Sequence, residues 1–178
     1  MWTLKKPAGA KLIIGLLGCD KNALDTAVEA ITKKFGKVDF ISDIWPFEQT
    51  GYYAKETGQN ILRQFVSIEK PVCPGRLAKI KHQTNRLERK LAGKIKTNLP
   101  RPVNIDPGLI ESSKLVLAST KDYSHRIYIG KKIRAETTLI YDKGQWKTFD
   151  YTYPDYRQKC YHDFFSRVRN KLVQQLRE

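Results

Sequence analysis

The feature that most constrains the fold is a short, uninterrupted apolar segment that is followed directly by an amphipathic one. Residues 11–17 read KLIIGLL, and a continuous apolar run of this length is typical of a strand buried on both faces of a sheet. Apolar residues then recur at helical spacing from Leu24 to Phe35. Asp20 is placed to cap this helix by accepting from free backbone N–H groups, and Gly36 is placed to end it. The pattern predicts a buried strand followed by an amphipathic helix.

The segments that follow complete a known order of elements. They are strands over residues 38–44 and 61–68, a helix with an apolar stripe over residues 74–93, and a short strand over residues 103–105. An Asp-Pro-Gly turn is expected to end the last strand at residues 106–108. The order β-α-β-β-α-β is the ferredoxin-like arrangement, in which both helices lie on one face of an antiparallel sheet. We therefore predict an α+β fold whose residues 11–106 form a ferredoxin-like half.

The second half, residues 114–178, has a different character. Strand-like segments occupy residues 126–129, 133–141 and 145–151. The short glycine-containing turns between them predict a three-stranded antiparallel meander. After Pro154, large apolar side chains at helical spacing indicate a terminal helix that should pack on its own chain. No internal repeat or clear linker interrupts the sequence, so we predict one domain over residues 1–178, a monomer or weak homodimer.

Charge and cysteine content limit the class of protein. Lysine and arginine number 33 against 18 acidic residues, giving a net charge of +15. This balance favours polyanionic partners such as nucleic acid, nucleotides or an anionic membrane surface. The three cysteines (Cys19, Cys73 and Cys160) are widely spaced and form no CxxC pair. Neither a disulfide framework nor a structural zinc site is encoded, and a reducing cytoplasm fits best.

The N-terminal segment superficially resembles a lipoprotein signal. Lys5 and Lys6 precede LIIGLLGC, which ends at Cys19. The apolar run is at the short limit for a signal peptide and continues into a well-formed helix pattern, so we favour a buried strand. No other segment approaches the roughly 20 apolar residues needed to span a bilayer. We expect a cytoplasmic protein with no membrane partner.

The densest group of chemically active side chains lies around residues 121–136. Histidine suits proton transfer near neutral pH, so His125 is a candidate acid or base. Arg126 offers a planar fork for phosphate, and Lys121 a point charge. Glu136 lies on the neighbouring predicted strand, where it could orient His125 or Arg126. The alternative is a cross-strand salt bridge with a structural role.

Asp106 is a third candidate for catalysis. It could present a carboxylate at the end of a strand, or it could simply cap the predicted turn. Together with His125 and Glu136 it would supply a mixed nitrogen and oxygen ligand set that several divalent metals accept. Asp155 lies just before the terminal helix, and we expect it to cap that helix.

A second polar group precedes and enters the third predicted strand. Adjacent Tyr52 and Tyr53 are followed by Glu56, and Arg63 follows on the strand itself. These residues are candidates for ligand binding. The alternative for the tyrosines is partial burial in a core, with each hydroxyl reaching a partner.

Residues 76–101 form a strongly basic segment. It holds nine lysines and arginines and a single acid, Glu88. Lys79, Arg86 and Lys90 lie on one side of the predicted helix, away from its apolar stripe, where they could track phosphates. The alternative is a solvated helix face. No aromatic residue interleaves these charges, so the segment alone encodes no stacking platform for single strands.

With these motifs in view, the chain resembles a family of small bacterial proteins known only as a domain of unknown function, some of which carry an automatic label of GTP-binding protein. The resemblance runs nearly end to end. It rests on KLIIGLLGCD, IWPFEQTGYYAKETG, RQFVSIEK, VNIDPGLI, SKLVLASTKDYSHRIYIGKKIRAETTLIYDKGQWK and TYPDYR. The family pattern has methionine at Thr57, tyrosine at Arg134 and usually tryptophan near Phe149. The residues that match it are Tyr52, Tyr53, Glu56, Gly58, Arg63, Asp106, Lys121, His125, Arg126, Glu136 and Asp155.

The resemblance implies no activity, and the sequence argues against the GTP label because it contains no GK[ST] phosphate loop. Three functions remain open. The first is binding or processing of a phosphate-bearing ligand, a nucleotide or RNA, in the Lys/His/Arg/Glu site. The second is a non-catalytic RNA- or ribosome-associated module that acts through residues 76–101, and the third is a metal-assisted hydrolase. The sequence identifies no cofactor and does not decide whether the protein is an enzyme.

Overall fold

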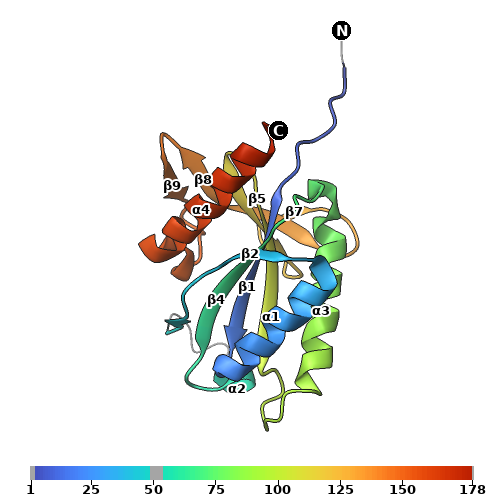
Figure 1. The fold of residues 1–178 in the computed structure, drawn as a ribbon, viewed down its shortest axis with the longest axis vertical. Coiled ribbons are helices and arrows are strands. Elements are labelled where there is room, and N and C mark those ends of the chain that lie inside the picture. Colours follow the sequence, from blue (N-terminus) through green and yellow to red (C-terminus); the bar gives the residue numbers. More distant parts are fainter. Residues whose placement is uncertain (1–2, 49–53, 178) are drawn as a thin grey trace.

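The computed structural model describes residues 3–48 and 54–177, which contain nine strands in one antiparallel sheet (Figure 1). The strands are β1 (Lys11–Gly18), β2 (Val38–Ile41), β3 (Trp45–Pro46), β4 (Leu62–Ile68), β5 (Val103–Ile110), β6 (Lys114–Ser119), β7 (Ile127–Tyr128), β8 (Arg134–Asp142) and β9 (Gln145–Thr148). The α-helices are α1 (Lys21–Phe35), α2 (Ala54–Thr57), α3 (Leu77–Ala92) and α4 (Lys159–Gln175). None of these helices is long and apolar enough to cross a membrane.

The first half has the predicted ferredoxin-like order. The sheet runs β2-β4-β1-β5-β6-β8-β7, with β3 beside β4 and β9 beside β8. All eight residues of β1 are buried, as its apolar run predicted. Asp20 caps α1 by accepting from the Ala23 backbone N–H at 2.7 Å, and Gly36 ends the helix at a φ of 105°. The α+β prediction is confirmed.

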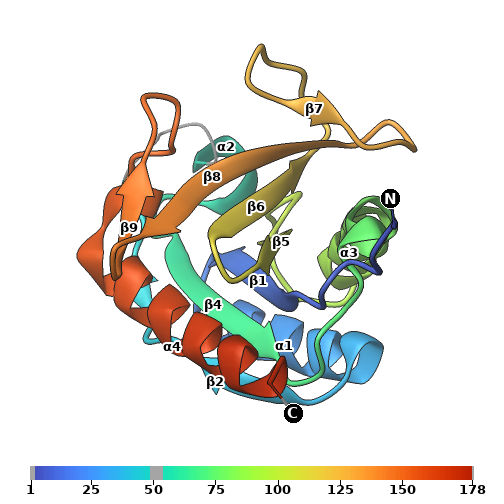
Figure 2. The ribbon, with the colours of Figure 1, turned by 90° about the horizontal axis from the view of Figure 1, so that it is seen from above.

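Two hydrophobic cores lie on opposite faces of this sheet. Leu12 and Ile14 of β1 pack with α1 and α3, whereas Ile13 packs with α4. Figure 2 shows α1 and α3 on one side of β4 and α4 on the other. The α4 core is rich in aromatic rings. The ring centre of Phe65 on β4 lies 4.8 Å from that of Tyr161, and Phe164 and Phe165 of α4 belong to the same core. The terminal helix therefore packs on its own chain, as its large apolar side chains predicted.

The predicted turn at residues 106–108 is wrong, because β5 runs straight through it. Gly108 pairs with Leu117 of β6, and a Cβ on this glycine would lie 2.6 Å from the Leu117 side chain. The same Cβ would lie 3.0 Å from the carbonyl oxygen of Val116. The glycine thus permits a close approach of two strands. Pro107, which has no N–H to donate, lies one residue before the point where β6 begins to pair.

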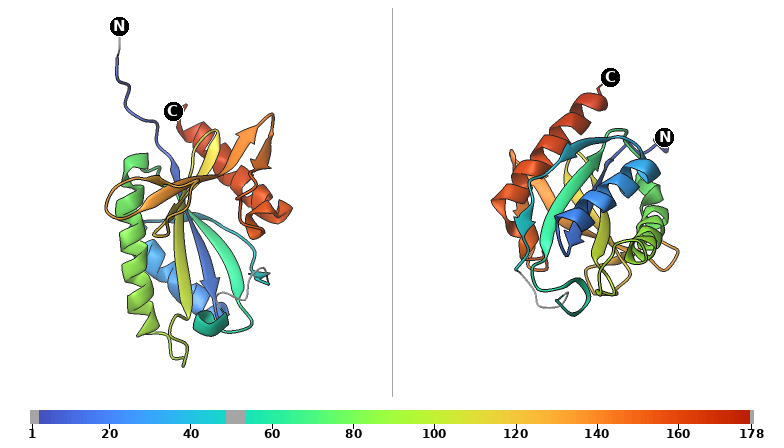
Figure 3. Two further views of the ribbon diagram at one scale, coloured as in Figure 1. Left: turned by 180° about the vertical axis from the view of Figure 1, so that it is seen from behind. Right: turned by 60° about the horizontal axis from the view of Figure 1, so that its bottom comes forward.

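β6 was not predicted, and it joins the two halves into one sheet. It pairs with β8 along most of its length but with β5 only over Gly108–Ile110. Residues 103–107 of β5 therefore pair, among the described strands, with β1 alone. The helix α3 lies along this open side of β5, as the rear view in Figure 3 shows. The predicted meander is confirmed as β7, β8 and β9.

Candidate functional site

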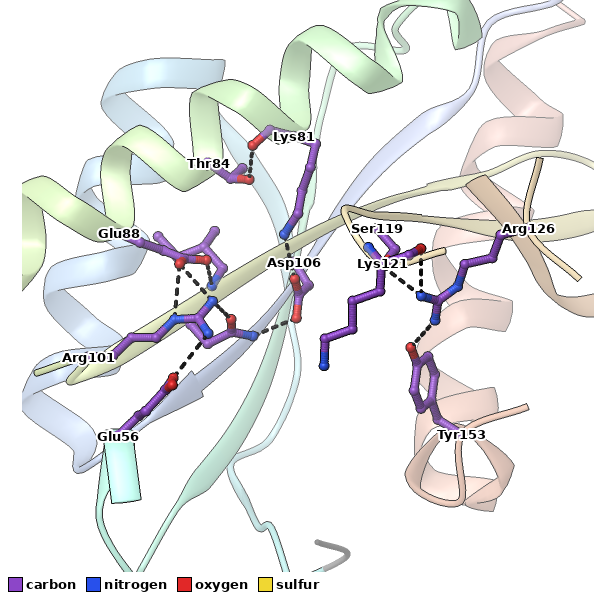
Figure 4. A network of polar contacts seen from close by, with 12 residues as sticks. Glu56, Lys81, Thr84, Glu88, Arg101, Asp106, Ser119, Lys121, Arg126 and Tyr153 are labelled. Carbon is purple, nitrogen blue, oxygen red and sulfur yellow. Dashed lines mark hydrogen bonds and ion pairs between the residues drawn. The ribbon is translucent and has the colours of Figure 1, made fainter. Parts of the chain in front are cut away.

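A cavity of about 380 Å³ opens where β5 and β6 separate. Its walls come from α3, β4, β5, β6 and β8, from the segments that follow β3, β6 and β9, and from the segment before β5. The charged side chains that line it are five cations and three carboxylates: Arg63, Lys81, Arg101, Lys121 and Arg126, with Asp106, Glu136 and Asp155. Figure 4 shows Lys81 and Asp106 in the middle. Arg101 lies on one side of them with Glu56 and Glu88, which we call the Arg101 cluster, and Lys121 and Arg126 lie on the other side. We call this space the central cavity.

At the middle of the cavity, Asp106 is held by two donors. Lys81 extends from α3 and places its Nζ 2.7 Å from Asp106 Oδ1 (Figure 4). The Asn104 amide donates to Asp106 Oδ2. Burial raises the pKa of Asp106, but Lys81 and the Asn104 amide lower it, and the net pKa lies below its ordinary value. Asp106 is therefore an ionised carboxylate at neutral pH, well suited to accept hydrogen bonds and poorly suited to take up a proton.

The Arg101 cluster closes the side of β5 that β6 leaves open. Glu88 Oε1 accepts the Ile105 backbone N–H at 2.8 Å, so a helix side chain satisfies a strand edge. Glu88 Oε2 lies 2.8 Å from Arg101 Nη2, and Glu56 reaches Arg101 Nη1 at 3.5 Å. Burial raises the pKa of Glu88, and Arg101 lowers it in part. The cluster thus fixes Arg101 at the cavity wall.

Arg63 is one of three buried cations of the cavity, with Lys81 and Arg126. It is 5% exposed, its Nη2 donates to Asp155 at 2.7 Å, and its guanidinium carbon lies 5.0 Å from the centre of the Phe47 ring. Its Nε and Nη1 are buried and make no hydrogen bond to any described residue. Gly15 leaves the necessary space, because a Cβ there would lie 3.1 Å from Arg63 Nη1 and 3.3 Å from the Tyr156 hydroxyl. Both nitrogens are closed off from solvent, and the Tyr161 hydroxyl lies near this guanidinium.

The expected role of Asp155 as a helix cap is wrong. The residue before α4 is Gln158, and no side chain among the described residues caps that helix. Asp155 lies in a short 3₁₀ turn (Asp155–Arg157), where its buried carboxylate pairs with Arg63. Removing this carboxylate from water would cost too much free energy without a cation beside it.

Arg126 and Glu136 form the other wall. Arg126 Nε donates to Glu136 Oε2 at 2.7 Å, and its Nη1 donates to Ser119 Oγ at 2.8 Å. Its Nη2 donates to the Tyr153 hydroxyl (Figure 4). All three nitrogens of this guanidinium are bonded within the protein. These bonds fix the position of the guanidinium, so Arg126 contributes positive charge to the cavity more than free hydrogen-bond donors.

His125 lies outside the central cavity. Its Nε2 is 3.2 Å from Glu136 Oε2, so it contacts the same carboxylate as Arg126. Its ring stacks on the Tyr151 ring, with 4.2 Å between the two ring centres. His125 also lines a second cavity of about 330 Å³, together with Ile127 and Ile129. The structure therefore brings Arg126 and Glu136 together in one cavity and leaves His125 behind Glu136.

The other predicted site residues are distributed as follows. Arg63, Asp106 and Lys121 line the central cavity, and Glu56 reaches it through Arg101. Tyr52 and Tyr53 lie outside the described residues. Lys79, Arg86 and Lys90 are exposed on α3. Within residues 3–48 and 54–177, no three His, Cys, Asp or Glu side chains are arranged to hold a metal ion, so the proposed Asp106, His125 and Glu136 set lacks geometric support.

Sequence reasoning missed Lys81, Arg101 and Asn104 as site residues. Two signals could have found them. Asn104 and Asp106 alternate with Val103 and Ile105, which is the pattern of a strand with one polar face. Lys81 and Glu88 are seven residues apart, so both lie on the buried stripe of α3 with Leu77 and Leu91. A lysine and a glutamate on an apolar stripe need polar partners, and these partners are on β5.

Comparison with known proteins places the chain in a family. A family model described as "Domain of unknown function (DUF4416)" matches residues 8–172. Searches of curated proteins and of solved structures gave no match. The match covers both halves of the sheet and every described residue of the central cavity. The chain belongs to the DUF4416 family.

Proposed function

We propose that this protein binds a small phosphate-bearing molecule, such as a nucleotide, in the central cavity. One observation carries the proposal: five cationic side chains and only three carboxylates converge on one cavity, which leaves an excess of positive charge there. Phosphate oxygens are strong acceptors for arginine and lysine.

The size and lining of the cavity also support a small ligand. A volume of about 380 Å³ lies within the range of small-molecule sites. Phe47 and Tyr156 add apolar surface beside the cations. Asp106 is partly exposed and could accept a hydrogen bond from a ligand hydroxyl or amine. A phosphate group together with such donors is the chemistry of nucleotides and sugar phosphates.

The geometry favours binding over processing. Each carboxylate of the lining is already in an ion pair: Asp106 with Lys81, Glu136 with Arg126, and Asp155 with Arg63. Each carboxylate is thus already engaged by a cation of the protein. His125 would reach a ligand only through Glu136. We therefore assign no reaction to the site.

Isothermal titration of the full chain with inorganic pyrophosphate and with adenosine diphosphate tests the proposal. Lys121 is exposed at the cavity mouth, so Lys121→Met should fold normally and weaken binding of both probes at least about tenfold, the loss expected for one charge-assisted contact. Lys33→Met, on the exposed end of α1, is the matched control and should bind like the unsubstituted protein. Absence of binding by the unsubstituted protein, or equal loss in both variants, would reject the central cavity as a phosphate site.

A further inference from the structure

The outer face of α3 carries a marked excess of positive charge. Of the nine lysines and arginines in residues 76–101, Lys81 and Arg101 point to the central cavity. Glu88, the single acid of this segment, is buried against β5. The other seven cations are all exposed: Arg76, Lys79, Arg86, Arg89, Lys90, Lys94 and Lys96. The inward turn of Glu88 makes this face more basic than the sequence composition suggests.

The turn between β7 and β8 extends this basic face. Residues 130–132 lie against α3, because His82 Nε2 is 2.7 Å from the carbonyl oxygen of Lys131. Figure 1 shows this turn beside the upper part of α3. Lys131 and Lys132 adopt left-handed backbone conformations, with φ of 54° and 59°. The turn adds two lysines to the face at fixed positions.

Exposed apolar and aromatic side chains accompany these lysines. Ile127 is 74% exposed, Tyr128 58% and Tyr123 55%. The Lys132 backbone N–H donates to the Tyr128 hydroxyl at 3.3 Å, which holds the ring against the turn. β7 is the last strand of the sheet, so its outer side carries no other described strand. An exposed ring held in place beside cations is suited to stack against a planar group of a partner.

We propose that α3 and the β7–β8 turn together form a docking surface for single-stranded nucleic acid. The exposed cations can neutralise phosphates of a strand, and the Tyr128 ring offers a face on which a base can stack. The basic segment by itself contains no aromatic residue, and folding supplies one from a segment some 40 residues away. A duplex would fit less well, because its bases are already stacked and paired. This inference is independent of the ligand of the central cavity.

Fluorescence anisotropy with labelled oligonucleotides tests the proposal. The oligonucleotides are about ten nucleotides long, which is an ordinary site size for such surfaces. RNA and DNA of one unstructured sequence, the matching duplexes and heparin are the probes. Tyr128→Ala should weaken single-strand binding by about five- to 150-fold, the range for one stacked base, whereas Tyr128→Phe should retain it. The double variant Lys131→Glu/Lys132→Glu should lower the salt slope by about 1.4, since each phosphate contact on a single strand contributes about 0.7.

Lys33→Glu/Lys34→Glu supplies the matched control, because it makes the same change of charge at exposed positions at the end of α1. It should leave the salt slope unchanged. All the variants should bind pyrophosphate as the unsubstituted chain does, which separates this surface from the central cavity. Binding of duplex or heparin as tight as that of single strands would overturn the proposal. Unchanged affinity in Tyr128→Ala, or equal effects of the two double variants, would overturn it as well.

Discussion

At the scale of single residues, the central cavity is built from ion pairs that are removed from water. Arg63 and Asp155 come from β4 and from the turn before α4, and each side chain is about 6% exposed. Burial raises the pKa of Tyr156 well above its ordinary value and that of Tyr161 to about 12, so both hydroxyls near this pair stay neutral. The charges of Arg63 and Asp155 neutralise each other, so the folded protein tolerates their burial only while both side chains are present.

Asp155→Asn should therefore destabilise the protein strongly. The substitution keeps the shape of the side chain but leaves the Arg63 charge buried without its counterion, which costs about 3–5 kcal/mol in the free energy of unfolding. Urea denaturation measures the effect. Arg63→Met/Asp155→Asn, which removes both charges, should be more stable than the single variant. A loss below about 1 kcal/mol in Asp155→Asn would place the pair in the class of weak, exposed salt bridges.

Asp106 gives a second prediction, for the dependence of stability on pH. Burial raises its pKa, Lys81 and Asn104 lower it, and the net pKa is below the ordinary value of about 3.9. The folded state thus binds this proton less readily than the unfolded state. The resulting stabilisation is present above about pH 4 and is lost as the pH falls through the folded-state pKa. Asp106→Asn should therefore be less stable than the unsubstituted protein at pH 7, and the difference should shrink on acidification.

Thermal unfolding at pH 7 and at pH 3 measures this difference. The comparison should be repeated in a Lys81→Met background, where the main source of the depressed pKa is removed and the pH dependence of the Asp106→Asn effect should change markedly. A difference that is the same at both pH values in the original background would contradict the assigned ionisation of Asp106.

The sequence predicted part of this site. Arg63 and Glu136 stand on predicted strands, Asp106 at a predicted strand end, and Lys121 and Arg126 in the polar segment around residues 121–136; all five line the central cavity. His125 was selected for its chemistry, and its position behind Glu136 depends on how the loop before β7 folds. Lys81 was treated as one charge among many, because local sequence does not show that a carboxylate on β5 faces it.

At the scale of elements, the cavity exists because β5 and β6 pair over only three residues, Gly108–Ile110. The sequence predicted a turn at this place, since Asp-Pro-Gly is a strong local turn signal. Tertiary contacts override that signal, because Pro107 and Gly108 are paired with Ile14 and Ile13 of β1. Strand β6 escaped prediction because its partners, β5 and β8, were assigned to separate halves of the chain.

Gly108→Ala tests the close approach of the two strands. The added methyl group would lie 2.6 Å from the Leu117 side chain and 3.0 Å from the Val116 carbonyl oxygen, so strand or side chain must shift. We expect a loss of about 1–3 kcal/mol in the free energy of unfolding. Gly75→Ala is the control, because its nearest neighbour is the Cys73 sulfur at an ordinary 3.8 Å, and its effect should be within about 0.5 kcal/mol. Equal tolerance of both substitutions would show that β5 and β6 are not tightly apposed at Gly108.

At the scale of the whole molecule, the sheet separates two hydrophobic cores. Its first face carries α1 and α3 over an aliphatic core, and its second face carries α4 over an aromatic core. The order of β1, β2, β4 and β5 was predictable from periodicity and turn residues, as was the need to cover α4. The cavity was not predictable, because it forms where β5 and β6 separate. Contacts between segments far apart in the sequence determine where these strands separate.

The central claim is that the cavity binds phosphate through Arg63 and its neighbours. The most direct test follows the arginine Nε–H signals in a ¹H–¹⁵N NMR spectrum while pyrophosphate is added to the full chain. Nε is without a hydrogen bond in Arg63 and bonded to Glu136 in Arg126, whereas Arg157 and Arg169 donate to backbone carbonyl oxygens away from the cavity. We predict saturable shifts of the Arg63 and Arg126 signals and none for Arg157 and Arg169. Equal shifts of all four signals, or no shift of the Arg63 signal at high pyrophosphate, would contradict the claim.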